Sequence, residues 1–199
     1  FNASLQQEFI EEYWRFKNNK GDNDKIYFVD GVHPVHNSMP AYGWIRKGTD
    51  KFLKSNTGRS RLNINGALDP DSLEVIARVD ETLATNSTLE LLKAIEAHNP
   101  TANTIWIILD NARYYYNKDV LNFIENSSKL EVRFLPPYSP NLNLIERVWR
   151  FFKKKILYNQ FYPSFQEFKK ACGDFFTYLP NYYDDLVPLI SDEFQIIEI

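Results

Sequence analysis

The hydrophobic pattern at the start of the chain predicts one helix followed by a group of strands. Over residues 3–17, apolar side chains recur near the helical period, and the polar run at 18–24 then interrupts them. Short apolar runs of strand length follow, several of them bounded by Gly or Asp. The predicted strands are residues 25–31, 41–48, 61–69 and 72–81.

In the second half of the chain, predicted strands alternate with predicted helices. Apolar runs at 104–112 and 130–136 have the length and composition of buried strands. Asn86 or Ser87 is a suitable cap for the first of the helices that follow. The predicted helices are residues 88–99, 116–126, 142–158 and 164–179. Strands first, then strands alternating with helices, predict an α/β protein with a mixed sheet flanked by helices.

The length and composition indicate one folded domain with short appendages. A chain of 199 residues with 44% hydrophobic residues can bury a full core. We predict an N-terminal linker helix at 1–24, the main domain at 25–180 and a tail at 181–199. From Asp184 onward this tail has five acids and no base.

Several classes of protein are disfavoured. The chain has no apolar run of membrane-spanning length, and its first residues carry acids where a signal peptide needs an apolar segment. The single cysteine, Cys172, excludes an internal disulfide and a thiolate metal cluster. We therefore expect a cytoplasmic protein with no membrane partner, associated with the nucleoid if the source is prokaryotic.

Basic residues gather in two segments although the net charge of −3 argues against a general nucleic-acid binder. Together these segments could form one footprint for a polyanion, or they could be ordinary solvated faces. The candidate DNA contacts in the first segment are Arg46, Lys47, Lys51, Lys54, Arg59 and Arg61, and those in the second are Arg147, Arg150, Lys153 and Lys154.

Three carboxylates form the candidate for chemistry. Asp30 and Asp110 each end an apolar run, and if the two strands are neighbours their carboxylates lie side by side. Like charges that close share a proton or a cation, and Mg²⁺ or Mn²⁺ prefers oxygen ligands. Glu146, on the edge of an apolar helix, is the candidate third acid of a two-metal site. Spacing alone leaves turn and cap roles open for both aspartates.

Three sequence blocks resemble the signature blocks of DDE transposases. They are FVDGVHP at 28–34, ILDNARYY at 108–115 and LPPYSPNLNLIERVWRFFK at 135–153. The similarity covers about residues 25–158 and points to the mariner-like superfamily and related bacterial insertion-sequence transposases. Between the first two blocks, GWIRKG and INGAL also resemble the second and third strands of that family.

The resemblance implies a ribonuclease H-like fold and a catalytic site made of Asp30, Asp110 and Glu146. It implies that these acids bind Mg²⁺ or Mn²⁺, and we expect two ions. The implied activity is cleavage of DNA strands at transposon ends and transfer of the 3′ hydroxyl into target DNA. A homodimer is expected, because active transposases of this type usually work as dimers.

The chain departs from the family pattern at a few positions near these acids. Gly31 stands where many relatives have a second acid, Tyr115 and Tyr116 where relatives often have a His, and Leu144 where a Pro is common. None of these changes touches the three acids. Family members also carry N-terminal helix-turn-helix domains, for which there is no room before Lys25, so we expect a catalytic fragment or a truncated copy.

Other interpretations stay open from the sequence. A structure-selective nuclease of the same fold would cut DNA without joining ends, and a decayed element would leave a non-catalytic DNA-binding or dimerisation module. Near the acids, His33 and Asn111 are candidates for supporting the ligands or touching substrate. A structural role for His33 and a turn role for Asn111 are the alternatives.

Overall fold

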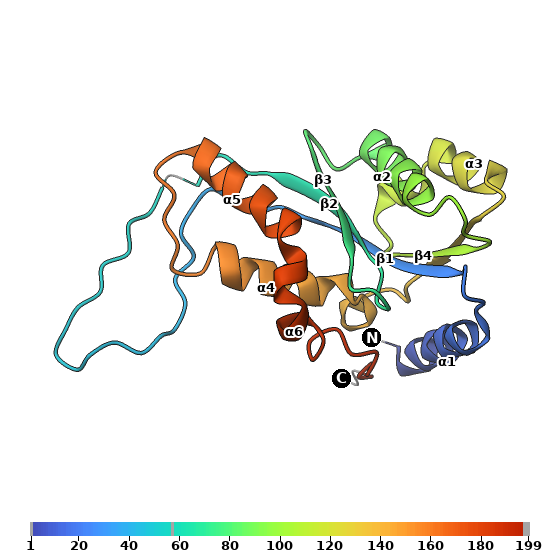
Figure 1. Cartoon of the computed structure of the whole chain (residues 1–199), viewed down its shortest axis with the longest axis horizontal. Coiled ribbons are helices and arrows are strands. Elements are labelled where there is room, and N and C mark those ends of the chain that lie inside the picture. The colour runs from blue at the N-terminus through green and yellow to red at the C-terminus, as the bar shows by residue number, and fades with distance from the viewer. Residues whose placement is uncertain (1, 57, 197–199) are drawn as a thin grey trace.

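The computed structural model describes residues 2–56 and 58–196, and a five-stranded sheet forms its centre (Figure 1). The strand order is β3-β2-β1-β4-β5. The middle strand β1 pairs antiparallel with β2 and parallel with β4, so the predicted mixed sheet is confirmed. The strands are β1 (Lys25–Val32), β2 (Asn63–Leu68), β3 (Val75–Asp80), β4 (Ile105–Leu109) and β5 (Leu130–Phe134).

Helices cover both faces of the sheet (Figure 1). On one face lie α1 (Ala3–Asn19), α4 (Ile145–Ile156), α5 (Phe165–Thr177) and α6 (Tyr183–Leu186). On the other face lie α2 (Thr85–His98) and α3 (Lys118–Asn126). Three short 3₁₀ helices complete the described elements: η1 (Arg113–Tyr116), η2 (Pro140–Leu142) and η3 (Leu179–Tyr182).

The two-residue period of the strands separates two hydrophobic cores. In β1, Ile26 and Phe28 belong to the core under α4, whereas Tyr27 and Val29 belong to the core under α2. By this alternation Asp30 follows the row that faces α4. In β4, Trp106 and Ile108 belong to the same α4 core, so the next position in that row is Asp110. The strand period therefore directs both aspartates to the side on which α4 lies.

The prediction of a strand at residues 41–48 is wrong. This segment has no strand partner and belongs to a long loop between β1 and β2 that extends away from the domain (Figure 1). Its apolar residues do not face a core, because Tyr42 and Trp44 are fully exposed. Both β1 and β2 already have a neighbour on each side in the sheet, so neither offers an edge for an extra strand here.

The start of α2 also differs from the prediction. The helix begins at Thr85, and neither Asn86 nor Ser87 is its cap residue. Instead Ser87 lies in the first turn, where its hydroxyl accepts from the Ala84 N–H at 2.8 Å and is 2.8 Å from the Ala84 carbonyl. A serine that reaches back in this way stabilises the helix start from inside the first turn.

Both ends of the described chain pack onto the sheet. The predicted N-terminal helix is confirmed as α1, and its Tyr13 ring lies edge-on to Phe194 of the tail with centroids 5.0 Å apart. Lys17 forms ion pairs with Asp71 and Asp192. The linker role of this helix and the boundaries of the predicted tail stay predictions, and residues 1 and 197–199 lie outside the described residues. Across the described part of the chain, no helix combines the length and apolar character needed to cross a membrane.

Gly66 in β2 makes room for the Trp149 side chain of α4. A Cβ at this position would lie 2.6 Å from Cη2 and 2.9 Å from Cζ2 of the indole. The ring cannot easily move away, because Trp149 is buried in the α4 core. The close approach of α4 to β2 therefore depends on a missing side chain.

We expect Gly66→Ala to lower the free energy of unfolding by about 1–3 kcal/mol, because it overpacks this contact. Urea denaturation monitored by circular dichroism measures the change. Gly173→Ala is the matched control, since it lies in α5 with no atom within 4 Å of the added Cβ. That control should raise stability by up to about 1 kcal/mol through helix propensity. Equal effects of the two substitutions would contradict the packing argument.

Candidate active site

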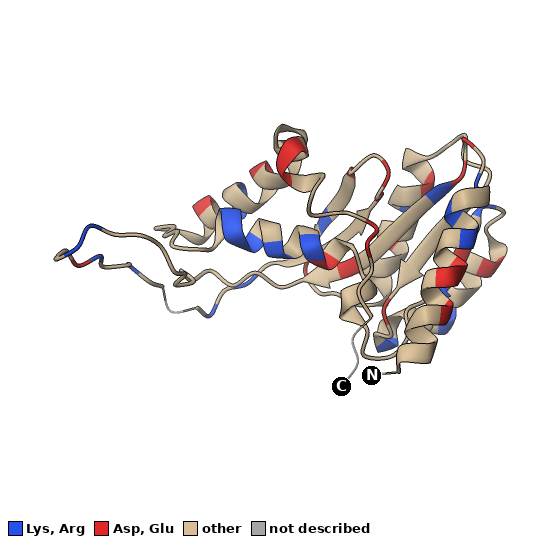
Figure 2. Cartoon of the chain, turned by 90° about the horizontal axis from the view of Figure 1, so that it is seen from below, with Lys and Arg blue, Asp and Glu red and all other residues tan. Residues whose placement is uncertain are grey.

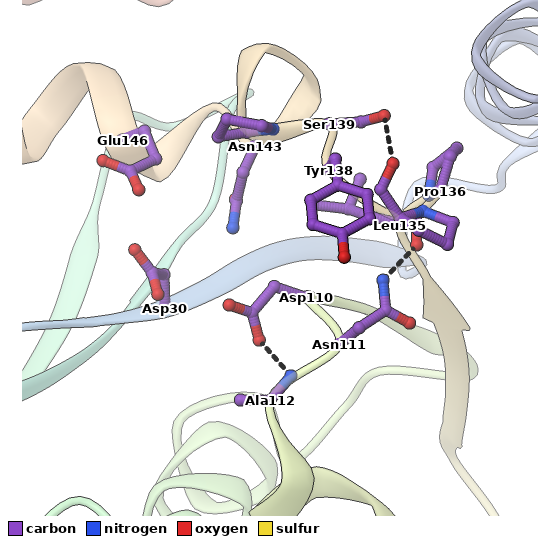
Figure 3. Close-up of a pocket in the computed structure, with 12 residues that line it drawn as sticks. Asp30, Asp110, Asn111, Ala112, Leu135, Pro136, Tyr138, Ser139, Asn143 and Glu146 are labelled. Atoms are coloured by element: carbon purple, nitrogen blue, oxygen red, sulfur yellow. Dashed lines mark hydrogen bonds between the residues drawn. The ribbon is translucent and has the colours of Figure 1, made fainter. Parts of the chain in front are cut away.

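Two neighbouring strands and one helix bring the three predicted acids together (Figure 3). Phe28 of β1 pairs with Ile108 of β4 in parallel register, so two residues further along each chain Asp30 and Asp110 stand at the same level. Glu146 lies in the first turn of α4 and faces Asp30. The prediction that neighbouring strands place these two aspartates together is confirmed.

One detail of that prediction is wrong. Asp110 does follow the end of β4, but Asp30 lies inside β1, which continues to Val32. The strand continues because β2 pairs with it there, with Asp30 opposite Gly66. The backbone of Asp30 is therefore fixed by strand pairing before and after the residue.

The three carboxylates line one cavity of about 480 Å³. Its walls come from the segment after β4, from the Pro-rich turn after β5 and from the start of α4 (Figure 3). The other residues that line it are Asn111, Ala112, Leu135, Pro136, Pro137, Tyr138, Ser139, Pro140 and Asn143.

Asp30 lies in an environment that disfavours its charged form. Burial, then the charge of Glu146 and more weakly that of Asp110, raises the pKa of Asp30 from 3.8 to about 8, against hydrogen bonds from Gly31 and Trp149 that lower it. Within the described residues, no Lys or Arg forms an ion pair with Asp30, Asp110 or Glu146. The site therefore concentrates negative charge that the protein itself does not neutralise.

Two residues on either side of Glu146 tie this part of the chain to β1. Trp149 donates its indole N–H to Oδ2 of Asp30 at 3.2 Å, and Asn143 donates its amide N–H to the Val29 carbonyl at 3.3 Å. Glu146 and Trp149 are three residues apart on α4 and so share one face of the helix, and Asn143 lies just before the helix begins. These two contacts hold Glu146 opposite Asp30.

The donor set suits a hard divalent cation. All three acidic side chains offer oxygen, and Oδ1 of the buried Asn143 has no hydrogen-bond partner within the described part of the chain. The described residues contain no three His, Cys, Asp or Glu side chains gathered closely enough to enclose an ion. This open arrangement fits Mg²⁺, which commonly uses one or two protein carboxylates and fills its remaining positions with water and phosphate.

The two residues predicted to support the acids have structural contacts of their own. His33 does not line the cavity, and its Nδ1 lies 2.8 Å from Oδ1 of Asn63. Asn111 does line it, donating to the Leu135 carbonyl at 2.7 Å and accepting from the Tyr116 hydroxyl at 2.6 Å. Asn111 therefore connects the end of β4 to the Pro-rich turn. His33 instead connects the segment after β1 to the start of β2.

The predicted basic residues fall into three groups. The six predicted bases of the first segment lie on the long loop between β1 and β2, here called the projecting loop. The base of this loop meets the end of α4, where Met39 pairs with Tyr158. On α4, Arg150 and Lys154 are exposed and Lys153 is partly exposed. Basic positions follow an acidic one along this helix (Figure 2). Arg147 differs, because its guanidinium donates to the carbonyls of Leu189, Ser191 and Glu193 in the tail. A phosphate contact by Arg147 would require these bonds to break.

The part of the chain that carries this site matches a known protein family. A sequence model of the DDE superfamily endonucleases matches residues 25–169, which include all three acids. The chain belongs to this family. A relative, the uncharacterized 39 kDa protein of insertion element IS630 from Shigella sonnei, is 24% identical over 125 residues. That match covers 63% of the chain and 36% of the relative, so the chain spans little more than a third of its length.

Solved structures share the fold of this chain. The catalytic domain of Mos1 mariner transposase has a TM-score of 0.59 at 15% identity, with 97% of the chain and 93% of that domain covered. The Mos1 transposase paired-end complex with the left transposon end has a TM-score of 0.65 at 17% identity, covering 97% of the chain and 63% of its own. This likeness confirms the predicted ribonuclease H-like fold.

Sequence reasoning missed the hydrogen-bonding residues around Glu146. Trp149 is buried in the core, and its indole also bonds Asp30. Its three-residue spacing from Glu146 was the available signal, because that spacing places both side chains on one side of the helix. Asn143 precedes the helix with an extended backbone, so helical spacing could not have indicated it.

The raised pKa of Asp30 predicts the pH dependence of stability without divalent metal. Between about pH 4 and pH 8 the folded chain keeps a proton on Asp30 that the unfolded chain has released. The free energy of unfolding should therefore fall as pH rises through this window, by on the order of a few kcal/mol. Urea denaturation in EDTA across this pH range measures the fall.

Asp30→Asn should flatten that pH dependence, because the amide cannot ionise. Asp50→Asn is the matched control, since it makes the same change at an exposed acid of the projecting loop. An equally steep fall in wild type and Asp30→Asn would contradict the assignment to Asp30.

Proposed function

We propose that this chain is the catalytic domain of a DNA transposase that cuts strands at transposon ends and transfers the 3′ hydroxyl into target DNA. The observation that carries the proposal is the gathering of Asp30, Asp110 and Glu146 in one cavity that no described Lys or Arg lines, in a chain of the DDE endonuclease family. Phosphoryl transfer on DNA needs a site of this kind, because negative charge develops on a substrate that is already anionic.

The proposed site would hold Mg²⁺ or Mn²⁺, as two ions, on the three carboxylates. When bound, the ions would activate the attacking oxygen and stabilise the leaving oxygen of an in-line displacement. Two of the Mos1 paired-end complexes with this fold are complexes with Mn and with Mg, which supports the choice of metal. The protein's own contribution is orientation: Trp149 fixes one oxygen of Asp30, and Asn143 fixes the start of α4.

DNA would approach over the exposed bases of α4 that follow Glu146. Arg150 and Lys154 are one turn apart and exposed, so both can reach phosphates. The projecting loop adds Arg46, Lys47 and Lys51, and its base contacts the end of α4. Other members of the fold have been seen in complexes with transposon ends and in a strand transfer complex, which supports DNA as the partner.

We further propose that the active assembly is a homodimer in the cytoplasm. The exposed Tyr42, Trp44 and Phe52 of the projecting loop are apolar surface that a single domain leaves in water. The chain covers only part of the length of its relatives. The proposal therefore names no residues of this chain for recognising specific DNA ends.

Removing any one of the three acids should abolish DNA cleavage. We expect Asp30→Asn, Asp110→Asn and Glu146→Gln each to reduce cleavage of a supercoiled plasmid in Mg²⁺ or Mn²⁺ by on the order of 100-fold or more. Calorimetric titration with Mn²⁺ should show weaker binding in the same variants. Circular dichroism should show an unchanged fold, and Asp50→Asn provides the control for loss of one acid.

The outcomes of this experiment separate the alternatives. Cleavage by the wild type without joining of ends to target DNA would favour a structure-selective nuclease. No Mn²⁺ binding by the wild type would favour a non-catalytic remnant. Undiminished cleavage by all three variants would contradict the proposed site.

Neutralising the exposed bases of α4 should weaken DNA binding in a salt-dependent way. For Arg150→Gln/Lys154→Gln, the slope of log affinity against log salt should become shallower by about 0.9 for each phosphate that the variant no longer neutralises. Fluorescence anisotropy with a labelled duplex at several salt concentrations measures the slope. Lys93→Gln/Lys118→Gln removes two exposed charges from the opposite face of the sheet and should leave the slope unchanged. An unchanged slope in the α4 variant would exclude this helix from the DNA interface.

A further inference from the structure

Tyr138 stands out among the residues that line the acidic cavity. Its backbone has a φ of 57°, in the left-handed region that bulky residues rarely adopt, and its side chain is 82% exposed. Within the described residues its ring has no aromatic contact and its hydroxyl has no hydrogen bond. A strained backbone therefore holds an aromatic side chain in a position where nothing in the described protein stabilises it.

The other described non-glycine residues with positive φ have an evident compensation. Leu73, with a φ of 61°, is buried in the core under α4, so its side chain gains from burial. Asn159, with a φ of 57°, belongs to a residue type that tolerates this region, and its amide exchanges hydrogen bonds with the main chain of Ala41. Tyr138 has neither form of compensation.

The turn around Tyr138 is held rigidly on both sides. Before it, the N–H of Leu135 donates to the Leu109 carbonyl at 2.8 Å, and the Leu135 carbonyl accepts from Asn111 at 2.7 Å. After it, Ser139 is buried, and its carbonyl accepts from the Leu142 N–H at 3.1 Å. Three prolines, at 136, 137 and 140, further restrict the backbone. The exposed position of the ring is thus imposed by the fold.

The Tyr138 ring and the exposed bases of α4 lie on opposite sides of the carboxylates. Figure 3 shows Glu146 facing Asp30 on one side, Asp110 next to them, and Tyr138 on the opposite side, above Asp110. The exposed bases of α4 continue beyond Glu146. A DNA strand with its phosphate at the carboxylates would therefore meet cationic side chains in one direction and the Tyr138 ring in the other.

We propose that Tyr138 stacks on an unpaired DNA base next to the phosphate that is cut. An exposed aromatic ring binds any base by its face, whereas a base within a duplex has both faces covered by its neighbours. The proposal rests on the proposed function, because it places the phosphate at the three acids. It adds a selectivity to that function: the enzyme prefers a cutting site whose flanking base is unpaired.

The test compares two DNAs that differ only in pairing. One is a blunt duplex, and the other is the same duplex with a short unpaired flap whose first base is the fluorescent analogue 2-aminopurine. Binding is measured by anisotropy in Ca²⁺ in place of Mg²⁺, so that a divalent cation can hold the phosphate at the carboxylates, and gel electrophoresis checks that no strand is cut. The wild type should bind the flap DNA more tightly and quench the 2-aminopurine emission, because stacking quenches this base.

Tyr138→Ala should weaken binding to the flap DNA by about 5- to 100-fold and abolish the quenching, with less than about a twofold change for the blunt duplex. Tyr138→Phe should behave as the wild type, because stacking needs the ring and not the hydroxyl. Tyr178→Ala, which removes a comparably exposed tyrosine next to α5, should change neither affinity.

A stability measurement distinguishes substrate binding from a structural role. Tyr138→Gly should unfold at a higher urea concentration than the wild type, because glycine adopts positive φ without strain and no packing is removed. A lower midpoint for Tyr138→Gly would show that the ring supports the fold and would overturn the proposal.

The binding data also separate this proposal from the proposed function. If the wild type binds and cuts DNA but Tyr138→Ala retains full affinity and quenching, the stacking proposal is overturned and the proposed function stands. The same holds if Tyr138→Ala loses equal affinity for both DNAs, since the ring then does not bind an unpaired base. If the wild type binds neither DNA, both proposals are overturned.

Discussion

The parallel pairing of β1 with β4 is the constraint on which the candidate site depends. Its register brings Asp30 and Asp110 to one level, and the two-residue period of the strands turns both toward α4. A shift of one residue in either strand would send one carboxylate to the opposite face, into the core under α2. The buried apolar rows on both sides of β1 and β4 prevent such a shift, so the positions of the two acids follow from hydrophobic burial.

The third acid depends on a different kind of contact. Glu146 reaches Asp30 because α4 lies close to the sheet, and that approach requires Gly66 beneath the Trp149 ring. The same indole then donates to Asp30, so one side chain both fills the core and orients a carboxylate. Packing and chemistry are coupled here, because any change that lifts α4 from β2 also moves the donor away from Asp30 and moves Glu146 away from the site.

The sequence predicted these features unevenly, for physical reasons. Strand and helix positions with a buried row, such as 25–31 and 104–112, were predictable because burial imposes the period. The segment at 41–48 has a similar pattern, but its Tyr42 and Trp44 face solvent, and a local pattern does not reveal whether a partner strand exists. Asp30 and Asp110 were predictable from their positions at the ends of apolar runs, and Glu146 from its position on the edge of an apolar helix. The role proposed for Tyr138 was not predictable, because it is indicated by a positive φ that tyrosine disfavours and that the sequence does not reveal.

The distribution of charge explains how a chain with a net charge of −3 can offer a surface for DNA. The acidic tail first meets the far end of α4, where Asp185 pairs with Lys155 at 3.3 Å, and then reaches α1, where Asp192 pairs with Lys17. Along the way its carbonyls engage Arg147, the first base after Glu146. The bases that remain exposed on α4 therefore begin one turn further from the carboxylates. Among the described residues, no Lys or Arg lines the cavity beside Glu146. Under the proposed function, this arrangement would leave room for a divalent cation while the bases just beyond attract phosphates.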